Sequence, residues 1–270
     1  MFEVDFYLKD LESKFKKINS KDYYLSYSGG KDSHFLYCFI KEYLQDNDIT
    51  IVGSNTYMEH HEILQRIIKN SDVVLKPTMK PFEIKEKYGI PCFSKQQDYF
   101  IEYFQNGSQA KSVLERFYGT SKSWFNVSKK AREYVLSENA HKISPKCCKY
   151  LKKEPFRLYE KESGKKAILG VRSCESKMRR SQYKSCFTKD RKFTPIYDLT
   201  DGLLDQIYEA YNIEIPNVYK YVTRTGCMGC PYGSYKKECE VELQLINENQ
   251  RKFVTKYFKE SYDVLGVHYE

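Results

Sequence analysis

A strand, a glycine turn and a helix start follow one another without a gap near the beginning of the chain. Residues 23–28 are typical of a strand, Gly29 and Gly30 follow, and an apolar-periodic helical segment begins after Ser33. Glycines without Cβ let the main chain approach an oxyanion closely, and the N–H groups of a new helix face it with the positive end of the helix dipole behind them. This pattern predicts an anion-binding loop, to which Lys31 adds a charge and Ser33 a hydroxyl.

The loop differs from two common nucleotide motifs. Its order of residues is neither the Walker A pattern G-x-x-x-x-G-K-[ST] nor the dinucleotide pattern G-x-G-x-x-G, which disfavours a kinase-type ATPase and a dehydrogenase. Further strands are predicted at 49–56 and 73–76, with helices at about 33–45 and 59–70. This alternation predicts an α/β fold, with a twisted parallel sheet and helices on both faces. Asn55 and Thr56 end the second strand, where nucleotide-binding residues lie in open sheets of this kind.

The cysteines form a second pattern. The chain has nine, of which Cys147 and Cys148 are adjacent and Cys227 and Cys230 form a C-x-x-C pair. Adjacent thiols bridge each other only with strain, and the charged start of the chain is unlike a signal peptide, so a reducing, cytoplasmic location is expected. Cysteine pairs in such a protein indicate metal ligands or catalysts. Four thiolates suit either structural zinc or an iron–sulfur cluster.

Charge is unevenly distributed along the chain. The segment 111–192 holds 23 Lys or Arg against 8 Asp or Glu, whereas the whole chain of 270 residues carries a net charge of +9. Cations interleaved with some of the 25 tyrosines suit a nucleic-acid strand, so tRNA or DNA is an expected partner. A basic cleft for a small nucleotide with several negative groups is the alternative. No segment has the uninterrupted apolar length of a membrane span, so no membrane partner is expected.

Three segments resemble known motifs. Ser-Gly-Gly-Lys-Asp-Ser at 28–33 resembles the PP-loop of ATP pyrophosphatases and sulfonucleotide reductases. The segment 147–156 resembles the C-C-x-x-x-K-x-x-P-[LF] motif of assimilatory adenylyl-sulfate reductases, and the later C-x-x-C completes their 4Fe-4S pattern. The segment 170–179 is similar to G-x-R-x-x-[ED]-S-x-x-R of phosphoadenosine phosphosulfate reductases. The chain thus resembles the phosphoadenosine phosphosulfate reductase family, with its adenine nucleotide α-hydrolase-like fold, from about Tyr23 to Cys230.

The resemblance implies roles for individual residues. ATP with Mg²⁺, or an adenylyl sulfate compound, would be bound by Ser28, Gly29, Gly30, Lys31, Asp32, Ser33, Asn55, Thr56, Gly170 and Arg172. Lys31, Asp32 and Arg172 would be catalytic. A 4Fe-4S cluster in an iron–sulfur-bearing C-terminal region would be held by Cys147, Cys148, Cys227 and Cys230, with Lys152 close to it. The expected domains are a nucleotide-binding α/β domain at 1–235, with a helical insertion at about 106–143, and a helical tail at 236–270.

The C-terminus departs from the family. Sulfonucleotide reductases carry a nucleophilic cysteine in a C-terminal E-C-G-L-H motif, whereas the last cysteine here is Cys239, between acidic residues that raise a thiol pKa. The expected function is therefore ATP-dependent sulfur transfer that forms AMP and pyrophosphate, with nucleic acid as a candidate acceptor and a sulfur or electron donor protein as partner. A reductase that releases sulfite, with Cys239 as its nucleophile, is the alternative. A nucleic-acid-binding module without catalysis is the third reading.

Overall fold

The chain forms two compact units, each built from separate stretches of sequence. The structure is a computed structural model, and it describes residues 2–123, 125–236 and 238–269. Unit 1 comprises Met1–Asn55, His61–Lys76 and Pro155–Tyr219, and unit 2 comprises Thr56–His60, Pro77–Glu154 and Lys220–Glu270. The domains expected from the sequence, 1–235 and 236–270, remain a prediction about which parts fold independently.

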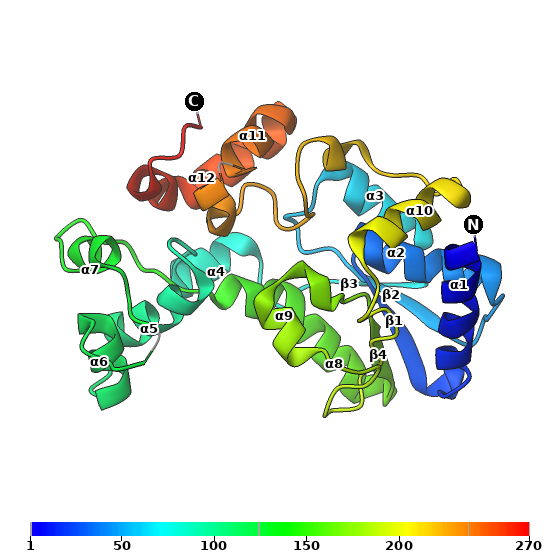
Figure 1. Cartoon of the computed structure of the whole chain (residues 1–270). Coiled ribbons are helices and arrows are strands. Elements are labelled where there is room, and N and C mark those ends of the chain that lie inside the picture. Colours follow the sequence, from blue (N-terminus) through cyan, green and yellow to red (C-terminus); the bar gives the residue numbers. More distant parts are fainter. Residues whose placement is uncertain (1, 124, 237, 270) are drawn as a thin grey trace. The chain divides into compact units, whose positions relative to one another are not determined.

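Unit 1 contains a four-stranded, all-parallel sheet (Figure 1). Its strands are β1 (Tyr23–Tyr27), β2 (Thr50–Ser54), β3 (Val73–Leu75) and β4 (Lys166–Leu169), in the order β3-β2-β1-β4. The predicted α/β class with a parallel sheet is confirmed, and the three strands predicted at 23–28, 49–56 and 73–76 correspond to β1, β2 and β3. The carboxyl ends of parallel strands meet at one edge of the sheet, where loops gather binding residues.

Helices cover both faces of this sheet. On one face, Tyr24 of β1 and Val52 of β2 pack against Phe156 and Tyr159 of α8 (Glu154–Ser163). On the other face, the Tyr27 hydroxyl lies 2.9 Å from Nδ1 of His34 in α2 (Lys31–Cys38). Helix α3 (His61–Asn70) lies on the same face, since Gly53, the register partner of Tyr27, faces it. Both faces are thus shielded from water, as parallel sheets require.

The helix that follows the glycine turn is not uniform. Helix α2 (Lys31–Cys38) continues as a single π-helical stretch over Phe39–Tyr43, so the predicted helix at 33–45 is present in two forms. The other α-helices of unit 1 are α1 (Phe2–Phe15), α3 (His61–Asn70), α9 (Lys177–Gln182) and α10 (Asp201–Ala210). Short 3-10 turns lie at Ser20–Asp22, Ser173–Glu175 and Asn217–Lys220.

Unit 2 is mainly helical in its described part. Its helices are α4 (Pro81–Tyr88), α5 (Lys95–Gln105), α6 (Lys111–Tyr118), α7 (Lys129–Val135), α11 (Glu238–Leu245) and α12 (Glu248–Leu265), with a π-helical turn at Cys148–Lys153 and a 3-10 stretch at Pro231–Lys236. Helices α6 and α7 lie within the insertion predicted at about 106–143. One core joins α4, the cysteine segment and α12 through Ile84, Leu151 and Tyr257. Across the described residues, every helix is too short or too polar to cross a membrane.

The contact between β2 and α3 gives a stability prediction. A Cβ added at Gly53 would lie 2.5 Å from Cγ2 of Ile67 and from Oγ of Ser71. We expect Gly53→Ala to lower the free energy of unfolding by about 1 to 3 kcal/mol, because α3 must move off the sheet. Gly202→Ala on α10 is the matched control, since open space surrounds that position and alanine favours a helix. Urea denaturation measures both, and equal stability of the two variants would contradict the packing.

Candidate functional site: a phosphate loop and a cysteine cluster

The predicted anion loop lies between β1 and α2 in unit 1. Gly29 has a positive φ of 70°, and Gly30 is the N-cap of α2. Ser33 is buried, and its hydroxyl donates to the carbonyl of Gly30 at 3.1 Å and accepts from the N–H of Ser28 at 3.2 Å. The Ser33 hydroxyl therefore braces the loop from within, and its contact with a nucleotide stays a prediction.

Gly170 closes the loop from the neighbouring strand. It follows β4, which pairs with β1, and a Cβ at this position would lie 2.9 Å from the backbone nitrogen of Ser33. Only glycine fits there without displacing the first turn of α2. The structure thus brings Gly170 to the loop across more than a hundred residues of sequence.

Arg172 lies beside the same turn, where it is bound by two carboxylates. Its Nε donates to Asp32 at 2.5 Å and its Nη1 donates to Asp201 at 2.7 Å. Burial raises the pKa of Asp32 although Arg172 opposes this shift. Burial disfavours the charge of Arg172, but Asp32 and Asp201 outweigh it and raise the pKa of the guanidinium. Arg172 therefore stays charged beside the loop, and it is held by two carboxylates.

Two tyrosine hydroxyls form hydrogen bonds with the backbone of Lys31. The Lys31 N–H, the first of α2, donates to the hydroxyl of Tyr219 at 2.8 Å, and the hydroxyl of Tyr208 donates to the Lys31 carbonyl at 2.8 Å. The Lys31 ammonium lies 5.2 Å from the centre of the Tyr219 ring and 3.6 Å from a carboxylate oxygen of Asp205. An anion that uses the Lys31 N–H must therefore take the place of the Tyr219 hydroxyl.

Asn55 and Thr56 follow β2, which ends at Ser54, and they belong to different units. The N–H of Asn55 donates to the carbonyl of Leu75, so this residue continues the sheet at its carboxyl edge. Thr56 begins unit 2, where both its N–H and its hydroxyl donate to Glu59. Only Asn55 is therefore placed at the sheet edge of unit 1 that carries the loop.

All four predicted ligand cysteines belong to unit 2. Cys147 lies in the core of this unit, and Cys148 and Cys227 pack against that core. The charges of the four thiols influence one another, since Cys148, Cys227 and Cys230 all raise the pKa of Cys147 together with its hydrogen bond to Cys148 and its burial. The structure therefore places the C-C and C-x-x-C pairs in one unit, near enough for their charges to interact, and a shared ligand set stays a prediction.

Lys152 faces this cysteine cluster. Cys227 is the main cause of the raised pKa of Lys152, ahead of the opposing effect of burial. Burial in turn raises the pKa of Cys227 and of Cys230, with Lys152 opposing it in both. A hydrogen bond from Cys147 lowers the pKa of Cys148. Burial thus disfavours the thiolates of Cys227 and Cys230, and positive charge close to them favours their ionised forms.

The donor set fits a metal or cluster that binds thiolates. Four cysteine sulfurs are the ligands of structural zinc and of iron–sulfur clusters, and such ions supply the positive charge that buried thiolates need. Among the described residues, however, no three His, Cys, Asp or Glu side chains are arranged as ready metal ligands. The four thiols therefore support a metal or cluster site by their chemistry, while the arrangement of all four around one metal or cluster stays a prediction.

A buried network holds the turn between Cys227 and Cys230. Glu242 of α11 accepts from the N–H of Gly229 at 2.6 Å and is also bonded to His60. The hydroxyl of Tyr262 donates to the Gly229 carbonyl, and Gly229 has a positive φ of 59°. A Cβ at Gly229 would collide with that hydroxyl. Helices α11 and α12 thus set the position of the C-x-x-C turn.

Cys239 belongs to this network. Its side chain is 1% exposed, and its thiol donates to the Gly229 carbonyl at 3.3 Å. Burial raises the pKa of Cys239 to about 12, with the nearby carboxylates of Glu242 and Glu240 adding to the shift. A thiol in this state is a poor nucleophile. In this structure Cys239 therefore supports the C-x-x-C turn.

Several of these residues were not singled out in the sequence. Glu242 could have been found, because it lies at helical spacing among the buried positions Cys239, Leu243 and Ile246 and so interrupts an apolar face. Tyr208 and Tyr219 carry no such signal in a chain with 25 tyrosines. Cys174 was seen only as part of a motif, and its sulfur lies 3.3 Å from Nη1 of Arg172.

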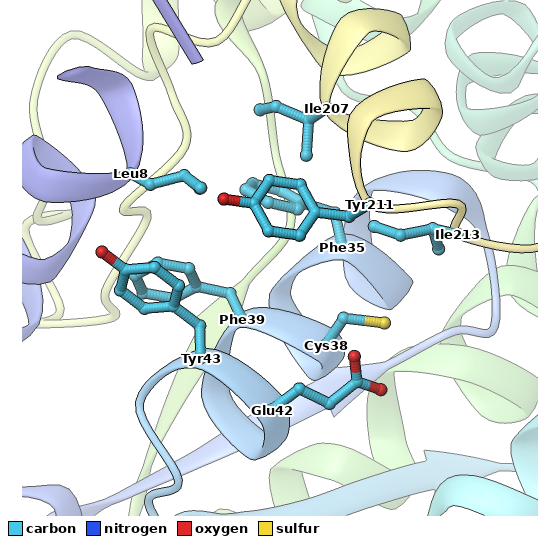
Figure 2. A pocket seen from close by; sticks show the side chains of 9 residues that line it. All are labelled: Leu8, Phe35, Cys38, Phe39, Glu42, Tyr43, Ile207, Tyr211 and Ile213. Carbon is cyan, nitrogen blue, oxygen red and sulfur yellow. The ribbon is translucent and has the colours of Figure 1, made fainter. Parts of the chain in front are cut away.

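Unit 1 also contains a cavity of about 150 Å³ away from the loop (Figure 2). The later turns of α2 line it, whereas the predicted anion loop lies at the start of that helix. Its lining is Leu8, Phe35, Cys38, Phe39, Glu42, Tyr43, Ile207, Tyr211 and Ile213. Because this lining holds a carboxylate and no cation, the cavity does not suit a phosphate.

Neither a protein-family model nor a curated protein matches this chain. The likeness to the reductase family therefore depends on the motifs and on the placement of their residues.

The state of Cys239 gives a chemical prediction. In native, metal-free protein we expect iodoacetamide to alkylate Cys239 at least about tenfold more slowly than Cys174 or Cys186, because it is buried and its thiolate forms only at high pH. Mass spectrometry after timed quenching measures each site, and labelling in urea is the control for intrinsic reactivity. Alkylation of Cys239 as fast as the two partly exposed thiols would contradict this assignment.

Proposed function

We propose that the protein is an ATP-dependent sulfur-transfer enzyme of the PP-loop type. The observation that carries the proposal is the loop at 28–33, which opens α2 at the carboxyl edge of a parallel sheet and against which Gly170 is packed. Backbone N–H groups at a helix start, a lysine and an arginine then gather at one turn. This is an arrangement for the phosphates of a nucleotide.

In the proposed reaction an oxygen of the acceptor attacks the α-phosphorus of ATP and pyrophosphate leaves. A sulfide then attacks the adenylylated acceptor and forms the bond between acceptor and sulfur, and AMP leaves with the former acceptor oxygen. Lys31 and the N–H groups of α2 stabilise the charge that develops on the phosphates, which is the largest contribution expected in such chemistry. Arg172 adds positive charge and orients Asp32 and Asp201, whose carboxylates are of the type that Mg²⁺ prefers.

The cysteines Cys147, Cys148, Cys227 and Cys230 are proposed to hold a 4Fe-4S cluster, which when bound can hold or deliver sulfur or brace the fold. The network of Glu242, Tyr262 and Cys239 would keep the C-x-x-C turn in place for that purpose. The basic segment 111–192 remains the proposed contact for a tRNA or DNA acceptor.

A sulfite-releasing reductase is the second candidate, and the burial of Cys239 disfavours it. The reductase cycle needs a thiol that attacks the sulfonucleotide, whereas Cys239 is occupied as a donor to Gly229. In unit 1, the Cys174 thiol lies close to Arg172, and burial raises the pKa of Cys174 as well. The state of these two thiols therefore favours ATP-dependent chemistry over reduction by this chain alone.

The first test follows the two products. With ATP, sulfide and a nucleic-acid acceptor, we expect AMP and pyrophosphate in equal amounts. With phosphoadenylyl sulfate and thioredoxin, we expect no sulfite above background.

A binding measurement tests the loop itself. Lys31→Ala should weaken nucleotide binding by about 1.5 to 3 kcal/mol, the value of a charge-assisted contact. Lys69→Ala removes an exposed charge from α3 and should leave binding unchanged. Chromatography and calorimetry provide the measurements.

Two results would overturn the proposal. Sulfite release that disappears in Cys239→Ser or in Cys174→Ser would make the reductase correct. ATP binding that is equal in wild type and Lys31→Ala would place the nucleotide site elsewhere.

The second test concerns the cluster. Protein purified without oxygen should be brown and contain about four irons per chain. Cys227→Ser should bleach it, because one of the four thiolates is lost, whereas Cys186→Ser in unit 1 should keep the colour. Colourless wild-type protein with one zinc per chain would contradict the iron–sulfur proposal and leave the cysteine site itself standing.

A further inference from the structure

A surface of unit 2 combines two stacked tyrosine rings with lysines, on backbone segments that hydrogen bonds hold together. The segment at the end of α4 is joined to the segment before the cysteines by two hydrogen bonds, from the Ile90 N–H to the Lys142 carbonyl and from the Ser144 N–H to the Ile90 carbonyl, each 3.0 Å long. Gln105 at the end of α5 bonds the second segment on both sides, with its amide at 2.8 Å from His141 and 2.9 Å from the Ile143 N–H. Three separate pieces of chain are thus held in fixed register.

Two tyrosines stand on this scaffold. The rings of Tyr88 and Tyr150 are stacked, with centroids 5.1 Å apart and planes 12° from parallel, and their hydroxyls are 2.8 Å apart. Both side chains are partly exposed. Because each ring is oriented by the other, little conformational freedom remains to be lost when a third ring stacks on the pair.

Lysine ammonium groups surround the pair. Lys146 lies 4.5 Å from the centre of the Tyr88 ring, Lys87 lies 5.3 Å from it, and Lys149 lies 5.0 Å from the centre of the Tyr150 ring. Lys146 is also paired with the buried Glu102 at 2.5 Å, so it is held in place, whereas Lys87 and Lys149 are exposed. Flexible exposed lysines can leave a ring face to a base and turn to the phosphate beside it.

A small cavity of about 90 Å³ adjoins the Tyr88 ring. It is lined by Lys87, Tyr88, Glu102, Gln105, Asn106, Lys142 and Ile143. Tyr99 and Tyr103, which are 48% and 43% exposed, lie at helical spacing from Glu102 and Asn106 and so on the same side of α5. Two further exposed rings thus lie on the side of α5 that carries two residues of the cavity lining, Glu102 and Asn106.

We propose that this surface, defined by Tyr88, Tyr150, Lys87, Lys142 and Lys149, binds single-stranded nucleic acid. A base stacks on the tyrosine pair, and the backbone phosphates on either side contact Lys87, Lys142 and Lys149. A duplex does not fit this mode, because its bases already stack on one another and do not offer a free face. An acidic protein would use the lysines but would leave the ring pair without a role.

This inference deepens the proposed sulfur-transfer function, since it assigns the acceptor to single-stranded nucleic acid and moves its contact from the whole basic segment to one surface. The binding test below uses neither ATP nor a sulfur donor. Its outcome is therefore separate from that of the enzyme assay.

The test is fluorescence anisotropy with labelled single-stranded DNA and RNA of about 12 nucleotides, a length within the site sizes of known single-strand binders. Tyr88→Leu should weaken binding about 5- to 150-fold, the change that corresponds to a base stack of about 1 to 3 kcal/mol. Tyr88→Phe keeps the ring and should bind like wild type. Lys87→Gln with Lys142→Gln should lower the slope of log affinity against log salt by about 1.4, because two phosphate contacts are lost.

Matched controls separate this surface from general charge. Lys252→Gln with Lys259→Gln removes the same charge from exposed positions of α12, outside the basic segment 111–192, and Tyr221→Leu removes a ring of unit 2 that is 47% exposed. Both should leave binding unchanged. Thermal melting and native alkylation of Cys239 check that each variant is folded.

Three results would overturn the proposal: equal binding of wild type and folded Tyr88→Leu, equal dependence of duplex and single-strand binding on Tyr88, or displacement of the oligonucleotide by poly-glutamate at similar phosphate and carboxylate concentrations. Binding that depends on Tyr88, without pyrophosphate formation from ATP, would support this surface and refute the enzymatic proposal. Pyrophosphate formation that the oligonucleotide stimulates equally in wild type and Tyr88→Leu would support the enzymatic proposal and refute this surface.

Discussion

The pairing of β1 with β4 is the constraint on which the candidate nucleotide site depends. Leu25 of β1 is opposite Ile168 of β4, and this register carries Gly170 to the backbone of Ser33 and Arg172 to Asp32. A shift of register by one residue would reverse the faces of β4 and move both residues away from the loop. The hydrogen-bond ladder between β1 and β4 therefore determines which residues meet at the ends of these strands.

The loop and its fold could be predicted from the sequence because their signals are local. A strand, two glycines and a helix start within a dozen residues are sufficient to place the turn, and the alternation that follows predicts the parallel sheet. The hydrogen bonds that the Ser33 hydroxyl makes within the loop were not predicted. That outcome depends on the curvature of the turn in three dimensions, which a residue pattern does not contain.

The partners of the site lie far away in the sequence and were harder to predict. Tyr219 meets Lys31 from the third segment of unit 1, and Glu242 meets Gly229 from a helix that the pattern of residues alone describes only as amphipathic. Such contacts are decided by which segments share a core. The pairing of Cys147 and Cys148 with the C-x-x-C turn was predicted only through a resemblance to a known motif. The packing of both pairs on one core of unit 2 supports it.

The discontinuous make-up of unit 2 affects the order in which the protein can mature. Its core joins Met58 and Ile84 to Tyr262 and Val267, so the core cannot close before α12 and the residues after it have been synthesised. Contacts between residues so distant in sequence form late, since a long loop must be closed first. The C-x-x-C turn is then braced only after α11 and α12 have been synthesised. Any metal proposed at the four cysteines would accordingly be loaded into a braced turn only after that point.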